Sequence, residues 1–182
     1  MAVVYGLFIS EEYLKNNTII DENVDMKLLL PTIWMAQTRH IQEAIGTVLY
    51  NDLVGKIAPT DTLAGDDLTL VDQYIAPALL YWTLYHADTT LLYKYRNKSI
   101  ATKGSDNATA VDFKTHIYLS DKHKDEAEWY TQRLIEYLCE NSTLYPLYDT
   151  ESGLDEIRPQ SHAQTSTIFL GPQYQKKCKI NQ

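Results

Sequence analysis

The stretch from Leu28 to Ile57, LLLPTIWMAQTRHIQEAIGTVLYNDLVGKI, places its apolar residues at helical spacing and interrupts that spacing once, at Gly46. Helices commonly end at a glycine, because glycine adopts backbone conformations that other residues avoid. Thr47 follows directly and has a side chain suited to an N-cap. The pattern therefore predicts two packed helices that meet at a glycine corner, where Gly46→Val would damage folding first.

Both helices of this corner have a predicted apolar side. Asp25 is the expected cap of the first helix, which tolerates Pro31 near its first turn. The expected core-facing residues of the first helix are Leu30, Trp34, Ile41 and Ile45, flanked by Ile33 and Ala44. Those of the second are Leu49, Leu53 and Ile57, with Tyr50 and Val54 beside them. We expect this corner to be a packed structural centre.

Further helical patterns lie on both sides of the corner. A short helix is predicted from a Ser10 cap to about Lys15, and a third long helix from about Leu68 to Tyr93, which Pro77 should kink or divide. Residues 94–111 break the helical period and fit either a β-hairpin or a mobile loop. A last helical pattern follows an Asp112 cap and reaches about Asn141, as one long helix or two shorter ones. The predicted fold class is all-α, with about four main helices.

The chain changes character near Tyr148. Residues 149–182 are punctuated by proline and glycine and hold one strand-like piece, TSTIFL. Segments without structure rarely carry apolar clusters, and the candidate docking residues of this segment are Ile168, Phe169, Leu170 and Tyr174. We therefore expect a helical domain over 1–148, with an insertion at about 94–111, and an extended C-terminal arm over 149–182 that docks on a partner.

The charge balance limits the possible partners. Sixteen basic and 24 acidic residues give a net charge of −8, which argues against a surface that binds nucleic acid by neutralising phosphates. An acidic wall past which DNA slides without sticking remains compatible with it. The 14 tyrosines suit either subunit contacts or the rim of a small core. No apolar run approaches the length that spans a membrane.

One group of residues suggests metal chemistry. Asp112, His116 and His123 are spaced by four and seven residues, which puts them on one helix face, and two histidines with a carboxylate can bind zinc or iron. This spacing matches no established ligand motif, and Asp112 is better explained as a helix cap. No glycine-rich phosphate loop, cysteine cluster or nucleophile elbow is present. We expect no enzyme activity, no metal and no cofactor.

The order of these elements carries a family resemblance. The opening ISEEYLKNNT, the Ile45-Gly46 corner, the Leu49-Tyr50 pair with Leu53, the tyrosine-rich third helix, the long fourth helix and the arm follow one another. Together they resemble the head-to-tail connector proteins of tailed bacteriophages, the adaptor or ring proteins beneath the portal. The sequence pattern is most similar to that of the connectors of crAss-like phages. The resemblance covers about Phe8 to Leu147.

The resemblance implies a structural virion protein. Such proteins form a homo-oligomeric ring, typically twelvefold, that binds the portal on one side and a downstream tail or neck protein on the other. DNA passes through the lumen without sequence-specific binding, no membrane is involved, and the location is the neck of the virion after synthesis in the host cytoplasm. Lys98 and Lys103 are then candidates for contact with an acidic neighbour or DNA.

Three alternatives stay open. Another neck or tail-completion protein shares the class and differs in position. A helical metal-dependent enzyme would use Asp112, His116 and His123. A helical DNA-binding regulator is disfavoured by the acidic charge.

Overall fold

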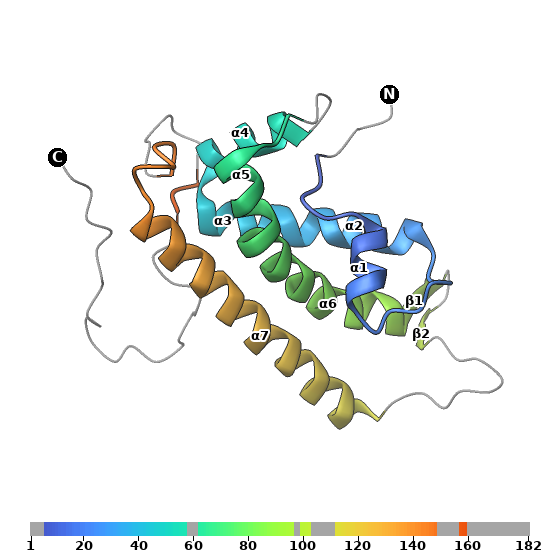
Figure 1. Ribbon diagram of the computed structural model, residues 1–182. Coiled ribbons are helices and arrows are strands. Elements are labelled where there is room, and N and C mark those ends of the chain that lie inside the picture. Colours follow the sequence, from blue (N-terminus) through green and yellow to red (C-terminus); the bar gives the residue numbers. More distant parts are fainter. Residues whose placement is uncertain (1–5, 58–61, 97–98, 103–111, 149–156, 160–182) are drawn as a thin grey trace, which may run out of the picture.

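The computed structural model describes residues 6–57, 62–96, 99–102, 112–148 and 157–159. These residues form a predominantly helical body with one small hairpin (Figure 1). The helices are α1 (Glu11–Asn17), α2 (Met26–Ala36), α3 (Gln42–Ile45), α4 (Thr47–Ile57), α5 (Gly65–Leu70), α6 (Ala76–Leu92) and α7 (Phe113–Glu140), with π-helical turns η1 (Gln37–Ile41) and η2 (Val71–Ile75) between neighbours. The all-α prediction is confirmed at this level.

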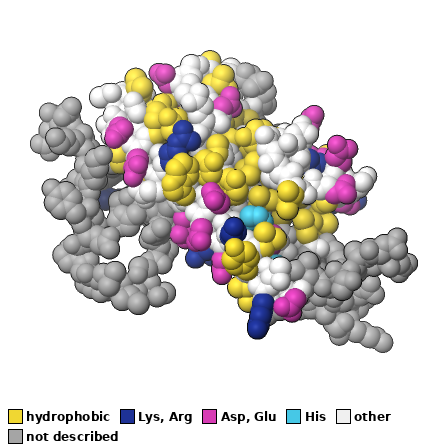
Figure 2. All heavy atoms as spheres, turned by 60° about the horizontal axis from the view of Figure 1, so that its bottom comes forward, with side chains coloured by type: hydrophobic (Ala, Val, Ile, Leu, Met, Phe, Trp, Pro, Cys, Tyr) yellow, Lys and Arg dark blue, Asp and Glu magenta, His cyan; other side chains and the backbone are white. Residues whose placement is uncertain are grey.

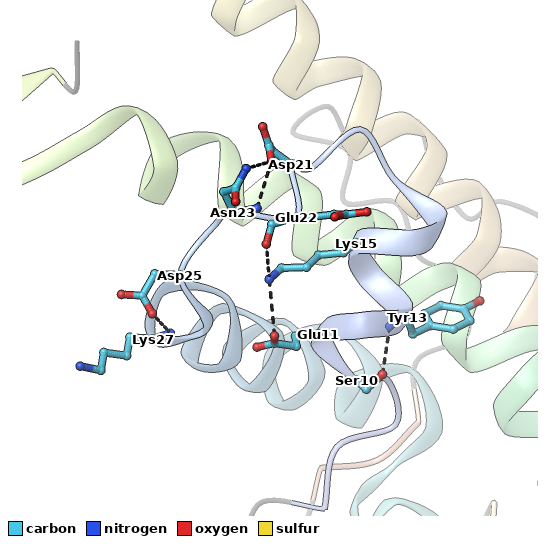
Figure 3. Close-up of polar contacts among 9 residues, drawn as sticks. All are labelled: Ser10, Glu11, Tyr13, Lys15, Asp21, Glu22, Asn23, Asp25 and Lys27. Atoms are coloured by element: carbon cyan, nitrogen blue, oxygen red, sulfur yellow. Dashed lines mark hydrogen bonds and ion pairs between the residues drawn. The ribbon is translucent and has the colours of Figure 1, made fainter. Parts of the chain in front are cut away.

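The two predicted caps of the N-terminal region are present (Figure 3). The Ser10 side chain accepts a hydrogen bond from the Tyr13 N–H, and the Asp25 side chain accepts one from the Lys27 N–H. Between these caps, the Lys15 ammonium donates to the Glu22 carbonyl oxygen at 2.9 Å. The loop between α1 and α2 is therefore tied back onto α1.

The first long helix is continuous from α2 through η1 to α3, and its π turn changes which side is buried. The Gln42 N–H bonds to the Gln37 carbonyl, five residues back. A π turn contains one residue more than an α-helical turn. The residues before the turn that face the core are therefore shifted by one position along the sequence. The predicted Trp34 is 42% exposed, and Leu29 and Ile33 are fully buried in place of Leu30 and Trp34. The predicted apolar side was right from Ile41 onward and at the flanking Ile33, and wrong at Trp34.

Pro31 lies inside this helix rather than near its first turn, as the sixth residue of α2. A proline at this position removes one backbone donor but leaves the preceding turns in place. The neighbouring Thr32 hydroxyl donates to the Leu28 carbonyl at 2.7 Å.

A second π turn carries the third helix past Pro77. The chain runs from α5 through η2 to α6, and the Ala76 N–H bonds to the Val71 carbonyl. This widened turn lies directly before Pro77, where a proline ring would otherwise press on the preceding turn. The helix is therefore continued through a π turn and not divided.

The segment after α6 begins as a hairpin. β1 (Tyr93–Arg96) and β2 (Ser99–Thr102) pair antiparallel, with Tyr93 opposite Thr102 and Arg96 opposite Ser99. This pairing favours the hairpin over the loop for the first part of 94–111, and residues 103–111 lie outside the described residues.

The core lies where α7 packs along α6 and where α2 packs against α6 (Figure 1). Its largest fully buried side chains come from α1, α2, the corner, α5–α6 and α7: Leu14, Leu29, Ile33, Ile41, Ile45, Leu53, Leu70, Ile75, Leu79, Leu134, Ile135 and Leu138. The buried Gln37 side chain joins the N-terminal segment to this core, since it accepts from the Phe8 N–H at 2.8 Å and donates to the Gly6 carbonyl at 2.9 Å. No helix among the described residues is long and apolar enough to cross a membrane.

Candidate functional site

The free end of α7, its N-terminal part before Ala127, exposes three consecutive apolar side chains. The helix is a single unit of 28 residues, and its buried side begins at Ala127. Before that point Ile117, Tyr118 and Leu119 are 42%, 62% and 38% exposed. Three consecutive residues on a helix cover about 200° of its circumference. The first turns of α7 therefore present apolar side chains in several directions and extend toward the bottom of Figure 1.

The same helix carries a second exposed aromatic residue. Trp129 is 58% exposed and lies eleven residues after Tyr118, which is about three helical turns. The two rings therefore share one side of α7. Among the tyrosines whose side chains are described, Tyr118 alone is exposed, and the others are buried or pack against the core. The tyrosine content thus reflects mainly the rim of the core.

A second feature is the contact between the glycine corner and residues 157–159. The Thr47 N–H donates to the Ile157 carbonyl at 2.9 Å, and the Ile157 N–H donates to the Thr47 hydroxyl oxygen at 3.0 Å. Gly46 has a φ of 80°, and a Cβ added there would lie 2.9 Å from the Pro159 Cδ. The corner thus binds the backbone of residues 157–159, and its glycine leaves room for a proline ring.

This contact corrects the predicted role of Thr47. Gly46 supplies the capping carbonyl of α4, since the Tyr50 N–H bonds to the Gly46 oxygen at 3.1 Å. Thr47 is the first residue of the helix, and its hydroxyl oxygen accepts from the Ile157 N–H and from the Gln42 side-chain amide instead of capping. Of the corner residues singled out from the sequence, Ile45, Leu49, Tyr50 and Leu53 are all buried in the core.

A third feature is a cleft of about 550 Å³ between η1, α6 and α7. On this face histidine lies among hydrophobic side chains, with acidic and basic side chains beside it (Figure 2). The His40 ring stacks on Trp82 at 3.6 Å, and its Nε2 lies 2.9 Å from the Nε2 of His86. The Trp82 indole N–H donates to the Thr131 hydroxyl at 2.9 Å, which ties α6 to α7.

Burial dominates the electrostatics of this histidine pair. Burial, followed by the neighbouring His86 and Arg39, lowers the pKa of His40 to about 3. Burial and Arg39 lower the pKa of His86 as well. Both rings are therefore neutral near pH 7 and can share one proton between their facing nitrogens. Because each Nε2 is occupied by the other, we assign the pair to the packing of α6 against η1.

The structure does not assemble the predicted metal ligands. His123 pairs with Asp88 of α6, with 3.0 Å between Nδ1 and Oδ2. Asp112 occupies the N-cap position of α7, although its side chain makes no capping hydrogen bond. No group of three or more metal-binding side chains occurs among the described residues. The remaining candidates, Ile168, Phe169, Leu170, Tyr174, Lys98 and Lys103, lie outside the described residues.

These features define a predominantly helical domain with exposed apolar side chains on α2 and α7. The model of a family of unknown function, DUF6712, matches residues 41–158 of the chain. The match covers more than half of the 182 residues, and the chain belongs to this family. It includes the glycine corner, α7 and the start of the segment that the corner holds. No curated protein and no solved structure matches the chain.

Proposed function

We propose that the chain is a structural virion protein, a head-to-tail connector subunit that forms a ring between the portal and the tail. The observation that carries this proposal is the free end of α7, where Ile117, Tyr118 and Leu119 are exposed together. Solvent-exposed apolar clusters of this kind mark protein–protein interfaces. The hydrophobic effect favours burying them, at roughly 25 cal/mol for each Å² removed from water.

A ring requires two unlike surfaces on each subunit. In a closed ring every subunit contacts its neighbours through a heterologous interface, so one patch meets a different patch on the next copy. The free end of α7 supplies one such surface. On α2, Met26, Trp34 and Met35 are 50%, 42% and 37% exposed, and the neighbours Trp34 and Met35 supply a second apolar surface. The two lie on different helices, as head-to-tail packing needs.

Charge supports the same function. The net charge of −8 disfavours tight DNA binding and suits a channel through which DNA slides. The three lysines Lys176, Lys177 and Lys179 lie in the arm, which has no acidic residue after Gln160. A basic, partly apolar arm is complementary to the acidic remainder of a neighbouring copy.

The experiment compares oligomeric state with and without the portal. We expect the purified chain to be a monomer or small oligomer, and to form a ring when mixed with the portal of the same virus, measured by light scattering and electron microscopy. Tyr118→Asp should reduce ring formation at least tenfold. Asn16→Asp, which adds the same charge at an exposed position of α1, is the control and should assemble normally.

Two outcomes would contradict the proposal. One is a chain that neither binds the portal nor occurs in purified virions. The other is equal assembly of Tyr118→Asp and Asn16→Asp, since the apolar end of α7 would then contribute nothing to the interface.

A further inference from the structure

The solvent side of α7 carries two exposed aromatic rings with a pair of opposite charges between them. Tyr118 is 62% exposed and Trp129 is 58% exposed. The two residues are about 16 Å apart along the helix axis, and the exposed Lys122 and Asp125 lie between them. At about 100° for each residue, all four side chains project within a sector of about 60°. We call these four residues the outer strip of α7.

Among the described residues, the packing partners of α7 lie on the other side of the helix. The buried residues Ala127, Leu134 and Leu138 project about 160–200° away from Tyr118. The elements that α7 packs on are chiefly α6, η2 and α3. On the outer strip itself, the Lys122 ammonium lies 5.5 Å from the centroid of the Tyr118 ring. The outer strip therefore faces away from the described core.

The order of the four residues is complementary to itself when one copy of α7 is turned end for end. In an antiparallel pair centred between residues 123 and 124, Tyr118 of each copy lies opposite Trp129 of the other, and Lys122 lies opposite Asp125. A two-fold pair uses the same patch on both copies in this way. Pairs of aromatic rings and pairs of opposite charges both favour contact. A parallel pair in register would instead place like charges opposite each other.

The acidic residues beside the outer strip are compatible with the antiparallel pair. Asp121 and Glu126 project about 60° and about 80° to opposite sides of Tyr118. In an antiparallel two-fold pair the same edges of the two strips meet, so Asp121 of one copy does not face Glu126 of the other. Glu126 lies on the same edge as Lys122 and brings a second carboxylate to that ammonium.

We propose that a second copy of this chain binds the outer strip, in an antiparallel two-fold pair of α7 helices. The pair requires neither the portal nor a ring, so it is independent of the proposed function. An aromatic side chain can bury roughly 150–250 Å², and more than half of each ring is free here. The four rings therefore supply roughly 400–600 Å², less than the roughly 1,200 Å² of a stable interface. The pair is weak, dissociates on dilution, and competes with any other partner of Tyr118.

Sedimentation equilibrium of the full chain without the portal, at micromolar to millimolar concentration and physiological salt, measures this pairing. We expect an equilibrium between monomer and dimer. Lys122→Asp puts like charges opposite each other and should raise the dissociation constant at least tenfold. Lys27→Asp makes the same change in charge at an exposed position of α2 and is the matched control, which should pair normally.

A charge swap gives a second readout. The double variant Lys122→Asp, Asp125→Lys restores opposite charges across the pair and should recover at least part of the lost affinity. All these positions are exposed, so circular dichroism should show unchanged helicity. A chain that is monomeric at every concentration would overturn the inference. So would equal pairing of Lys122→Asp and Lys27→Asp, or a swap that recovers nothing.

Cross-linking tests the antiparallel arrangement. Tyr118 is replaced by the photo-cross-linker p-benzoylphenylalanine in a mixture of equal amounts of light and ¹⁵N-labelled chain. Within one helix Trp129 is about 16 Å away along the axis, too far for a direct cross-link, so a cross-link to the peptide that contains Trp129 reports a second copy. We expect light–heavy pairs about as often as pairs of one mass. Cross-links between the two copies of position 118 would indicate a parallel pair and overturn the inference.

The pairing and the proposed function fail in different ways. A chain that stays monomeric but binds the portal through Tyr118 would overturn the pairing and leave the proposed function standing. A chain that pairs through the outer strip but never binds the portal would support the pairing and contradict the proposed function.

Discussion

Replacing Gly46 with alanine tests the energetics of the corner. The φ of 80° and ψ of 154° lie in a region that only glycine adopts readily, and placing another residue there costs about 1–3 kcal/mol. The added Cβ would also lie 2.9 Å from the Pro159 Cδ, so the segment must shift and weaken its two hydrogen bonds to Thr47. These bonds contribute about 0.5–1.5 kcal/mol each. Alanine also lowers the conformational entropy of the unfolded chain, which offsets about 0.4–1 kcal/mol of this loss in stability.

The expected loss in the free energy of unfolding is therefore about 2–4 kcal/mol for Gly46→Ala. For a chain of this length that corresponds to a fall in Tm of about 5–15 °C. The assay is urea unfolding followed by circular dichroism, together with the Pro159→Ala variant and the double variant. Removing the proline ring should recover at least about 0.5 kcal/mol of the loss, as a coupling between contacting residues. A neutral or stabilising Gly46→Ala, or strict additivity in the cycle, would refute this reasoning.

Three further variants test the core and its electrostatics. Ile33→Ala, at a fully buried position, should lose about 2–4 kcal/mol in urea unfolding, and Trp34→Ala less than about 1 kcal/mol; the reverse order would contradict the π-turn shift. Gln37→Met should cost about 2–3 kcal/mol and speed hydrogen exchange at the Phe8 amide, whereas unchanged exchange would exclude the bridge to the N-terminal segment. Because the pKa of His40 is lowered, the unfolded chain binds the proton first, and stability should fall as the pH drops from about 6.5 toward 3. His40→Phe should weaken the pH dependence of the urea midpoint between pH 4 and 7. An unchanged pH dependence would contradict the assignment of this effect to His40.

The helices and their caps could be predicted from the sequence because they depend on local chemistry. Ser10 and Asp25 are side chains that accept from N–H groups a few residues ahead, and Gly46 permits a conformation that alanine does not. These signals need no knowledge of distant residues. They were sufficient for the all-α class and for the corner itself.

The errors come from features that periodicity does not contain. A strict period of 3.6 residues cannot anticipate the extra residue of η1, which is why Trp34 was placed in the core. The polar Gln37 inside an apolar stretch was the available clue to an irregular, bridged position. The contact of Thr47 with Ile157 joins residues 110 apart in the sequence, and the pairing of His123 with Asp88 joins residues 35 apart. No local pattern encodes such partners.

The mass of the complex between this chain and the portal tests the central claim most directly. Native mass spectrometry or electron microscopy of the purified portal complex should reveal a closed ring of many copies of the chain on the tail-facing side of the portal. A complex in which the chain is absent, or bound as scattered single copies without contacts between them, would contradict the account.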